Sequence, residues 1–219
     1  MQDLERTFQH VEYFRRPEVV QSLTRILMAF SIYEASVGYV QGMNFIAAVL
    51  LYHGGEVAAF WLLCSLMEKY NLRDVLSHGL PGLRQHEEAL EKLGRQRMKS
   101  LFDHFDKHSV SVSLFTTDWI ISLLVNFIPI EISHIYLDLF FDHGWDVFYE
   151  VCLSILSFYQ PELLKLDDAG LIVGQIKQAR VGCEHLLMMT SLQSEVTNKL
   201  KQGESYWENE SVLKSEHSI

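Results

Sequence analysis

The sequence has little positive charge, few cysteines and no long uninterrupted apolar run. Its 219 residues carry a formal net charge of −10, so it lacks the basic stripe that a nucleic-acid-binding surface needs. The three cysteines, Cys64, Cys152 and Cys183, show no CxxC spacing, which argues against a disulfide framework and indicates a reducing compartment. We therefore expect a cytoplasmic protein with no nucleic-acid partner.

The apolar stretches are too short to predict a membrane span. They run over residues 45–51, 57–67 and 119–130, and each falls below the roughly 20 residues that a bilayer requires. The residues after Met1 are polar or acidic and show no signal sequence. We expect these stretches to form buried core helices, with no direct membrane insertion.

Ten histidines are present, but the spacings typical of a metal centre are missing. No His-Asp dipeptide occurs, and His86-Glu87 is not followed by a second histidine at HExxH spacing. The densest cluster, from Asp103 to His108, is typical of a solvated helix end. A metal-dependent helical hydrolase is therefore disfavoured, and we predict no metal site.

What the sequence does contain is helical periodicity. Hydrophobic residues make up 48% of the chain, enough for one domain with a sizeable core, and strand signals are weak. We expect an all-α domain in which Trp61, Trp119 and Trp145 are core residues. Helices are predicted over residues 18–35, 43–52, 56–70, 83–105, 114–127, 131–141 and 147–159, with a break at Gly54-Gly55 and a last helix capped by Asp167 or Asp168.

Two segments carry the candidate chemistry. The first, Asp3 to Phe8, contains an Asp and an Arg three residues apart, which on a helix usually form only a surface ion pair. The second, Gly38 to Asn44, places Gln41 beside glycines, where an isolated glutamine usually serves a turn or a cap. Each segment alone therefore has an ordinary structural explanation.

Together the two segments resemble the TBC domain of Rab GTPase-activating proteins. Asp3 and Arg6 match the family's IxxDxxR motif, whose Ile position falls before Met1, and Tyr39 to Gly42 match its YxQG motif in full. The stretches from Leu114 to Pro129 and from Asp138 to Trp145 are similar to later family segments, although Leu137 replaces the usual tryptophan and Gln9 a frequent proline.

The resemblance implies how the chain is organised. Residues 1–180 would form a single multi-helix TBC-type domain lacking its N-terminal helices, because the family's preceding RxxxW segment is absent. Residues 181–201 would form the C-terminal helix of this domain, and residues 202–219 a flexible polar tail. Without the preceding helices, apolar surface between residues 17 and 67 is expected to be exposed.

The resemblance also implies a mechanism with two inserted side chains. Arg6 would neutralise transition-state charge in a bound Rab GTPase, and Gln41 would position the attacking water. Asp3, Tyr39, Gly42 and Asn44 would support these fingers or contact the GTPase, with bracing favoured for Tyr39 and Asn44. The GTPase would carry GTP and Mg²⁺, so this chain needs no cofactor of its own. The alternative is a non-catalytic TBC domain that binds a Rab protein or serves as a scaffold, inactive because its N-terminal segment is missing.

Overall fold

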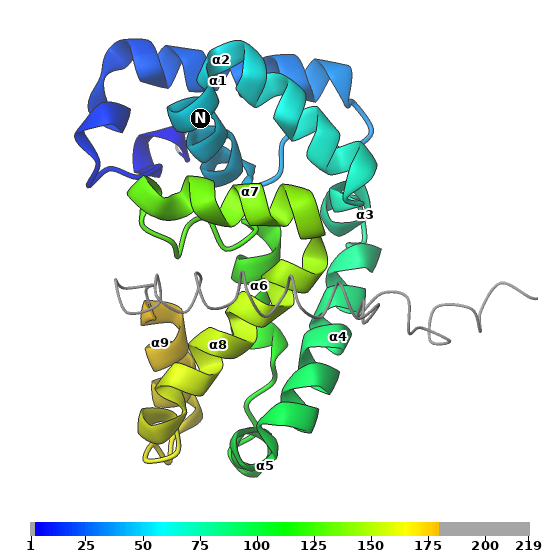
Figure 1. Ribbon diagram of the computed structural model, residues 1–219, viewed down its shortest axis with the longest axis vertical. Coiled ribbons are helices and arrows are strands. Elements are labelled where there is room, and N and C mark those ends of the chain that lie inside the picture. The colour runs from blue at the N-terminus through cyan, green and yellow to red at the C-terminus, as the bar shows by residue number, and fades with distance from the viewer. Residues whose placement is uncertain (1–2, 180–219) are drawn as a thin grey trace, which may run out of the picture.

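A computed structural model describes residues 3–179, and these residues form helices and connecting turns with no strand. The all-α prediction is confirmed. Figure 1 shows α1 and α2 at one end of an elongated molecule, α7 across its middle, and α4, α5, α6, α8 and α9 at the other end. The helices are η1 (Leu4–Arg6), η2 (Glu12–Arg15), α1 (Pro17–Tyr33), α2 (Met43–Lys69), α3 (Leu72–Leu76), α4 (Pro81–Arg97), α5 (Lys99–Lys107), α6 (Ser113–Ile121), η3 (Ile130–Ile132), α7 (Ser133–His143), α8 (Trp145–Leu163) and α9 (Ala169–Gln178).

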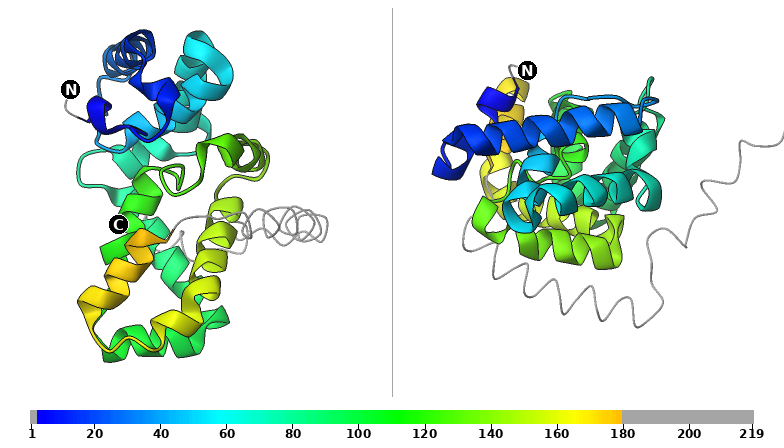
Figure 2. Two further views of the ribbon diagram at one scale, coloured as in Figure 1. Left: turned by 90° about the vertical axis from the view of Figure 1, so that its left-hand side faces the viewer. Right: turned by 90° about the horizontal axis from the view of Figure 1, so that it is seen from above.

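Helix α1 forms where its apolar periodicity predicts a helix. Pro17 occupies the first helical turn, where its missing N–H costs no intrahelical hydrogen bond. One stripe of the helix is buried, and α1 packs against α2; Figure 2 shows the two helices side by side. The buried residues of that stripe are Val19, Leu23, Ile26, Leu27 and Phe30. The helix therefore fixes the distance between the segment before Pro17 and the turn that follows Tyr33.

Helix α2 is kinked at the predicted glycine break. Gly55 has φ 76° and ψ 176°, a conformation that is essentially restricted to glycine. The sequence predicts two helices separated at these glycines, and the non-helical Gly55 indeed divides α2 into two helical segments. Of the helices in residues 3–179, α2 is the one long and apolar enough to cross a membrane. Length and composition alone do not indicate a membrane span, because a buried core helix passes the same test.

Two predicted helices are wrong in extent. The helix expected over residues 83–105 is broken at Met98, whose φ of −130° separates α4 from α5. The break folds α5 back so that Phe102 packs onto Gly94. The helix expected over residues 114–127 ends at Ile121, because Leu123 and Leu124 adopt left-handed φ values of 48° and 60°. This turn buries both leucines completely, and their burial outweighs their helical propensity.

Helix α9, at the end of the described chain, begins with the predicted side-chain cap. The Asp168 carboxylate accepts a hydrogen bond from the Leu171 backbone N–H at 2.9 Å and so caps α9. Helix α9 then continues past Gly170 and Gly174 to Gln178. The C-terminal helix and tail predicted for residues 181–219 lie outside the described residues.

The tryptophan prediction is correct at two positions and wrong at the third. Trp119 and Trp145 are buried in the core, whereas Trp61 is 57% exposed. Trp61 lies on the outer face of α2, where its ring meets Tyr33 and Phe60 edge-on. Helical periodicity therefore did not distinguish a core face from an aromatic surface cluster.

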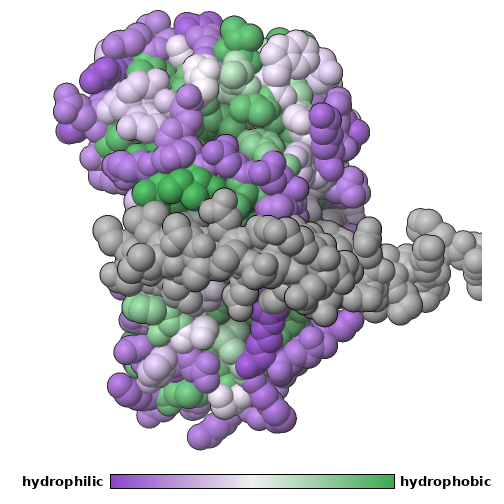
Figure 3. Space-filling model, in the orientation of Figure 1, coloured by the Kyte–Doolittle hydropathy of each residue, from purple (hydrophilic) through white to green (hydrophobic). Residues whose placement is uncertain are grey.

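Over the face seen in Figure 3, hydrophilic side chains predominate, and hydrophobic ones gather at the level of α7.

Candidate functional site

Arg6 is displayed by a short segment whose next residues are buried. It is the last residue of η1 and is exposed, and its guanidinium makes no hydrogen bond or ion pair with any residue in 3–179. Phe8 follows in a left-handed conformation, with φ 46°, and its ring packs against Phe14 and Phe45. This anchor holds the backbone beside Arg6 while leaving the arginine side chain available to a partner.

Gln41 is displayed in a similar way, in the turn between α1 and α2. Its side chain is exposed and has no hydrogen bond to the described part of the chain. Gly42 has φ 109°, and a Cβ built on it would lie 2.5 Å from Ile121 Cγ2. The turn is therefore seated directly on the end of α6, and only glycine fits this seat.

Two hydrogen bonds join the Arg6 segment to the Gln41 turn. The Tyr39 hydroxyl donates to Asp3 Oδ2 at 3.1 Å, and Asn44 Nδ2 donates to Thr7 Oγ1 at 2.8 Å. Asp3 and Thr7 lie on either side of Arg6 in the sequence, and Tyr39 and Asn44 lie on either side of Gln41. The structure thus brings the two sequence motifs together, although α1 separates them along the chain.

Asn44 is the centre of this network. It is buried at the start of α2, and its Oδ1 accepts the Gly42 backbone N–H at 3.0 Å while Nδ2 donates to Thr7. The Tyr39 hydroxyl also lies 3.4 Å from Asn44 Oδ1, but its single proton is better placed for Asp3. These bonds agree with a bracing role for Tyr39 and Asn44, and direct contact with a partner stays a prediction.

The protonation state of Tyr39 suits its role as a donor. The pKa of Tyr39 lies well above its usual value of 10.0. The largest cause is partial burial of the phenol, and the hydrogen bond to Asp3 and the charge of its carboxylate add to it. A phenol is protonated at physiological pH even at its usual pKa, and the raised pKa keeps Tyr39 a donor to Asp3 at more alkaline pH as well.

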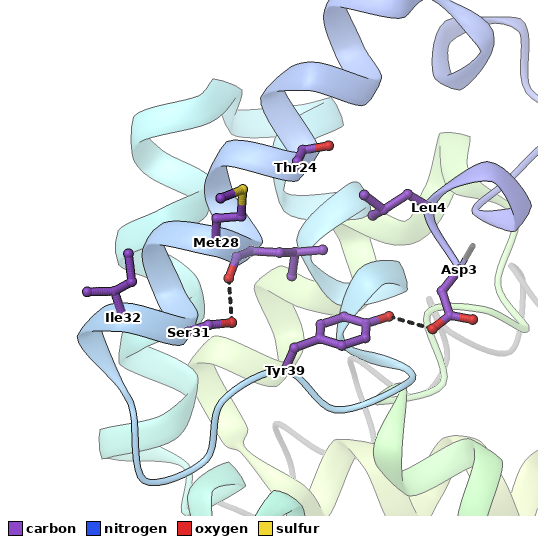
Figure 4. A pocket seen from close by; sticks show the side chains of 8 residues that line it. Asp3, Leu4, Thr24, Met28, Ser31, Ile32 and Tyr39 are labelled. Atoms are coloured by element: carbon purple, nitrogen blue, oxygen red, sulfur yellow. Dashed lines mark hydrogen bonds between the residues drawn. The ribbon is translucent and has the colours of Figure 1, made fainter. Parts of the chain in front are cut away.

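An apolar groove lies beside the network, between η1 and α1. Its volume is about 390 Å³, and Asp3 and Tyr39 close one end of it (Figure 4). The other lining residues are Leu4, Thr24, Leu27, Met28, Ser31 and Ile32. Met28 and Ile32 are exposed, as are Tyr33, Val57 and Trp61, so the predicted apolar surface between residues 17 and 67 is confirmed for these side chains.

Two of the histidines in the described residues contact other parts of the fold. His86 stacks on Trp145 with ring centroids 3.6 Å apart, and His104 Nε2 lies 2.8 Å from the Leu166 carbonyl oxygen. In residues 3–179 no group of three or more His, Cys, Asp and Glu side chains could hold a metal ion.

Sequence reasoning did not identify Thr7 or Ile121 as parts of this site. Thr7 is buried and contributes a hydroxyl to the network, while Ile121 forms the seat of Gly42. The position of Thr7 next to Arg6 was the one available signal. Nothing local in the sequence relates Ile121 to the glutamine turn.

Comparison with known proteins assigns the fold to a family. A sequence model described as the Rab-GTPase-TBC domain matches residues 1–164. Among solved structures, the Chlamydomonas flagellar RabGAP TBC domain superposes with a TM-score of 0.71 and 28% identity, covering 80% of this chain and 59% of that one. The Ypt/Rab-GAP domain of Gyp1p superposes with a TM-score of 0.70, covering 81% of this chain and 65% of that one. Because the two sequences are only 22% identical, this match shows a shared fold and no more.

Curated relatives agree with the structural match. The Rab GTPase-activating protein eat-17 of Caenorhabditis elegans is 32% identical over 78% of this chain, which spans 19% of that protein. The rat growth hormone-regulated TBC protein 1 is 32% identical over 82% of this chain, which spans 63% of that protein. The chain thus spans less than two thirds of the length of these relatives. The family model, which matches three quarters of the chain, nevertheless shows that the protein belongs to the Rab-GTPase-TBC domain family.

Proposed function

We propose that this chain accelerates GTP hydrolysis by a GTP-bound Rab-family GTPase, to which it supplies Arg6 and Gln41 in trans. One observation carries the proposal: both side chains are exposed and make no hydrogen bond or ion pair within residues 3–179, and hydrogen bonds join the segments that bear them. The names of relatives such as eat-17 support a Rab GTPase as the partner. The chain would act in vesicle trafficking, in the cytoplasm and on membranes to which its Rab partner recruits it.

Arg6 acts on the charge that develops at the transferred phosphoryl group. Its guanidinium is permanently charged and planar, so it can donate two hydrogen bonds to phosphoryl oxygens. An arginine given in trans accelerates GTP hydrolysis by roughly 10³- to 10⁵-fold. Because Arg6 has no intramolecular partner in residues 3–179, inserting it breaks no existing ion pair.

Gln41 acts on the nucleophile. Its amide can accept a hydrogen bond from the attacking water and donate one to the phosphate, which fixes the direction of attack. Gly42 and Asn44 hold the turn that presents it. Nothing in this mechanism requires a nucleophile or metal on this chain, because the GTPase carries GTP and Mg²⁺.

The test is GTP hydrolysis by a panel of purified Rab GTPases, with and without the chain. We expect Arg6→Ala and Gln41→Ala each to reduce the stimulated rate by about 10²-fold or more, with unfolding free energies within about 0.5 kcal/mol of wild type because both side chains are exposed. Arg84→Ala and Gln85→Ala are matched controls, since these residues are exposed on α4 and bear the same side chains.

Four results would change the proposal. Unchanged hydrolysis across the panel, from folded protein, would remove the catalytic function, and Rab binding without stimulation would support the non-catalytic alternative. Unfolding of the Arg6→Ala variant would make Arg6 structural. Replacing the GTPase's own switch glutamine should impair stimulation less than Gln41→Ala, and the opposite ranking would remove Gln41 from water positioning.

A further inference from the structure

The Thr7 hydroxyl lies at the junction of the two finger segments. Thr7 is 2% exposed, and its Oγ1 donates to the Asp3 carbonyl oxygen at 2.8 Å. The same oxygen accepts the Asn44 Nδ2–H at 2.8 Å. The hydroxyl therefore uses its proton on the η1 side and a lone pair on the α2 side.

These bonds form one directed chain between the two fingers. It begins at the Gly42 N–H, which follows Gln41 in sequence, and passes through Asn44 and Thr7 to the Asp3 carbonyl. That carbonyl also accepts the Arg6 backbone N–H at 3.2 Å. The chain thus ends on the same oxygen that closes the turn carrying Arg6.

We infer that Thr7 is a positioning residue for GTPase activation, and that its hydroxyl sets the placement of Arg6 relative to Gln41. This inference rests on the proposed function. Two side chains that must enter one active site together need a fixed separation, and an error of about 1 Å in such a geometry can reduce the rate about 10²-fold. The exposed Tyr39–Asp3 bond gives a weaker constraint because water competes for both of its partners.

The competing explanation is that Thr7 only fills space. Its methyl and hydroxyl are both buried, and at φ −75° and ψ 111° its backbone is extended, a conformation that suits any β-branched residue. Valine would fill the same volume without the hydroxyl. A space-filling role therefore predicts that Thr7→Val is active, whereas a positioning role predicts that it is impaired.

The experiment uses the panel member whose hydrolysis the wild-type chain stimulates most. We compare Thr7→Val, Thr7→Ala and Thr7→Ser with a matched control, Thr116→Val. Thr116 is fully buried in α6, and its hydroxyl donates to the Val112 carbonyl oxygen rather than to a finger segment. Stimulated kcat, KM for the GTPase and circular dichroism are measured for each variant.

We expect Thr7→Val and Thr7→Ala to lower the stimulated kcat by about 10- to 100-fold with KM changed less than about 3-fold. Thr7→Ser and Thr116→Val should stay within about 3-fold of wild type. A second readout is affinity for the GTPase loaded with GDP and aluminium fluoride, which mimics the transition state. Thr7→Val should weaken that complex by a similar factor while leaving binding to the non-hydrolysable GTP-analogue complex unchanged.

The outcomes separate this inference from the proposed function. If the wild type is active and Thr7→Val is equally active, the inference alone is overturned. It is also overturned if Thr7→Val loses affinity equally for the GTPase with GDP and aluminium fluoride and for the GTPase with the non-hydrolysable GTP analogue. Loss of the fold in both Thr7→Val and Thr7→Ala assigns the residue to stability and also overturns it. A wild-type chain that stimulates no GTPase overturns the proposed function and the inference with it.

Discussion

The contact between Gly42 and Ile121 allows a prediction worked directly from the structure. In Gly42→Ala the new Cβ would lie 2.5 Å from Ile121 Cγ2, well inside the ordinary contact range that begins at 3.4 Å. Relief requires a movement of about 0.9 Å, which the Ile121 side chain and the glutamine turn must share. The φ of 109° at this position adds backbone strain for any residue with a Cβ.

The expected loss of stability has two parts. Backbone strain at a glycine-specific conformation costs about 1–3 kcal/mol, and overpacking costs about 1–3 kcal/mol more. We expect a combined loss of about 2–4 kcal/mol, because partial movement relieves both. Displacement of the turn by several tenths of an ångström should also lower the stimulated rate by about 10-fold or more.

Gly38→Ala is the matched control within the same turn. Gly38 also has a positive φ, of 67°, but a Cβ built there would meet nothing within 4 Å. It should lose about 1–2 kcal/mol from backbone strain alone and keep most of its activity. In the double variant Gly42→Ala/Ile121→Ala the steric part should disappear, which gives a coupling of about 1–2 kcal/mol in a double-mutant cycle.

Urea unfolding and stimulated hydrolysis, measured on the same samples, provide the assay. Equal stability losses for Gly42→Ala and Gly38→Ala, with no coupling to Ile121, would refute the steric argument. A destabilised Gly42→Ala variant with full activity would refute the link between the seat of the turn and the placement of Gln41.

Two further predictions concern the core. Burial lowers the pKa of His86 to about 3 from an ordinary 6.5, so below pH 6.5 the unfolded chain binds a proton that the folded chain does not. The free energy of unfolding should therefore fall by about 1.4 kcal/mol per pH unit as pH drops from about 6.5 towards 3. His86→Gln should flatten this slope when unfolding by urea is measured across the pH range. Equal slopes for wild type and His86→Gln would contradict the prediction. In Gly94→Ala the Cβ would lie 2.0 Å from Phe102 Cζ, so overpacking of about 1–3 kcal/mol should exceed the helical gain of about 1 kcal/mol; a thermal midpoint above that of wild type would refute this.

The sequence predicted those parts of the fold that depend on local pattern. Helix α1 has one apolar stripe and a proline at its start, and α9 has a side-chain cap from Asp168, so each could be located without tertiary information. The break at Met98 could not, because it depends on Phe102 packing against Gly94 after α5 folds back. The left-handed turn at Leu123 and Leu124 likewise follows from burial that only the assembled core provides.

In the candidate site, too, some residues could be identified from local sequence pattern and others only from tertiary contacts. Arg6 and Gln41 were located because their neighbours form recognisable motifs, and the structure shows both to be exposed. The contribution of Thr7 depends on a hydrogen bond across 37 residues of sequence, and that of Ile121 on the packing of α6 under the turn. A pattern read along the chain identifies the residues that are displayed, whereas the residues that hold them become visible only through contacts in space.

The absence of intramolecular partners for Arg6 and Gln41 within residues 3–179 has an evolutionary consequence. Neither side chain contributes to the core of the described residues, so under the proposed function selection for activity, and not selection for folding, would retain them. Under the proposed function, a single nucleotide change at either codon would convert the activator into a protein that only binds the GTPase, without changing the stability of its fold. If Arg6 and Gln41 act as proposed, activity and folding depend on different residues, and the identity of these two exposed side chains distinguishes an activator from a binding domain.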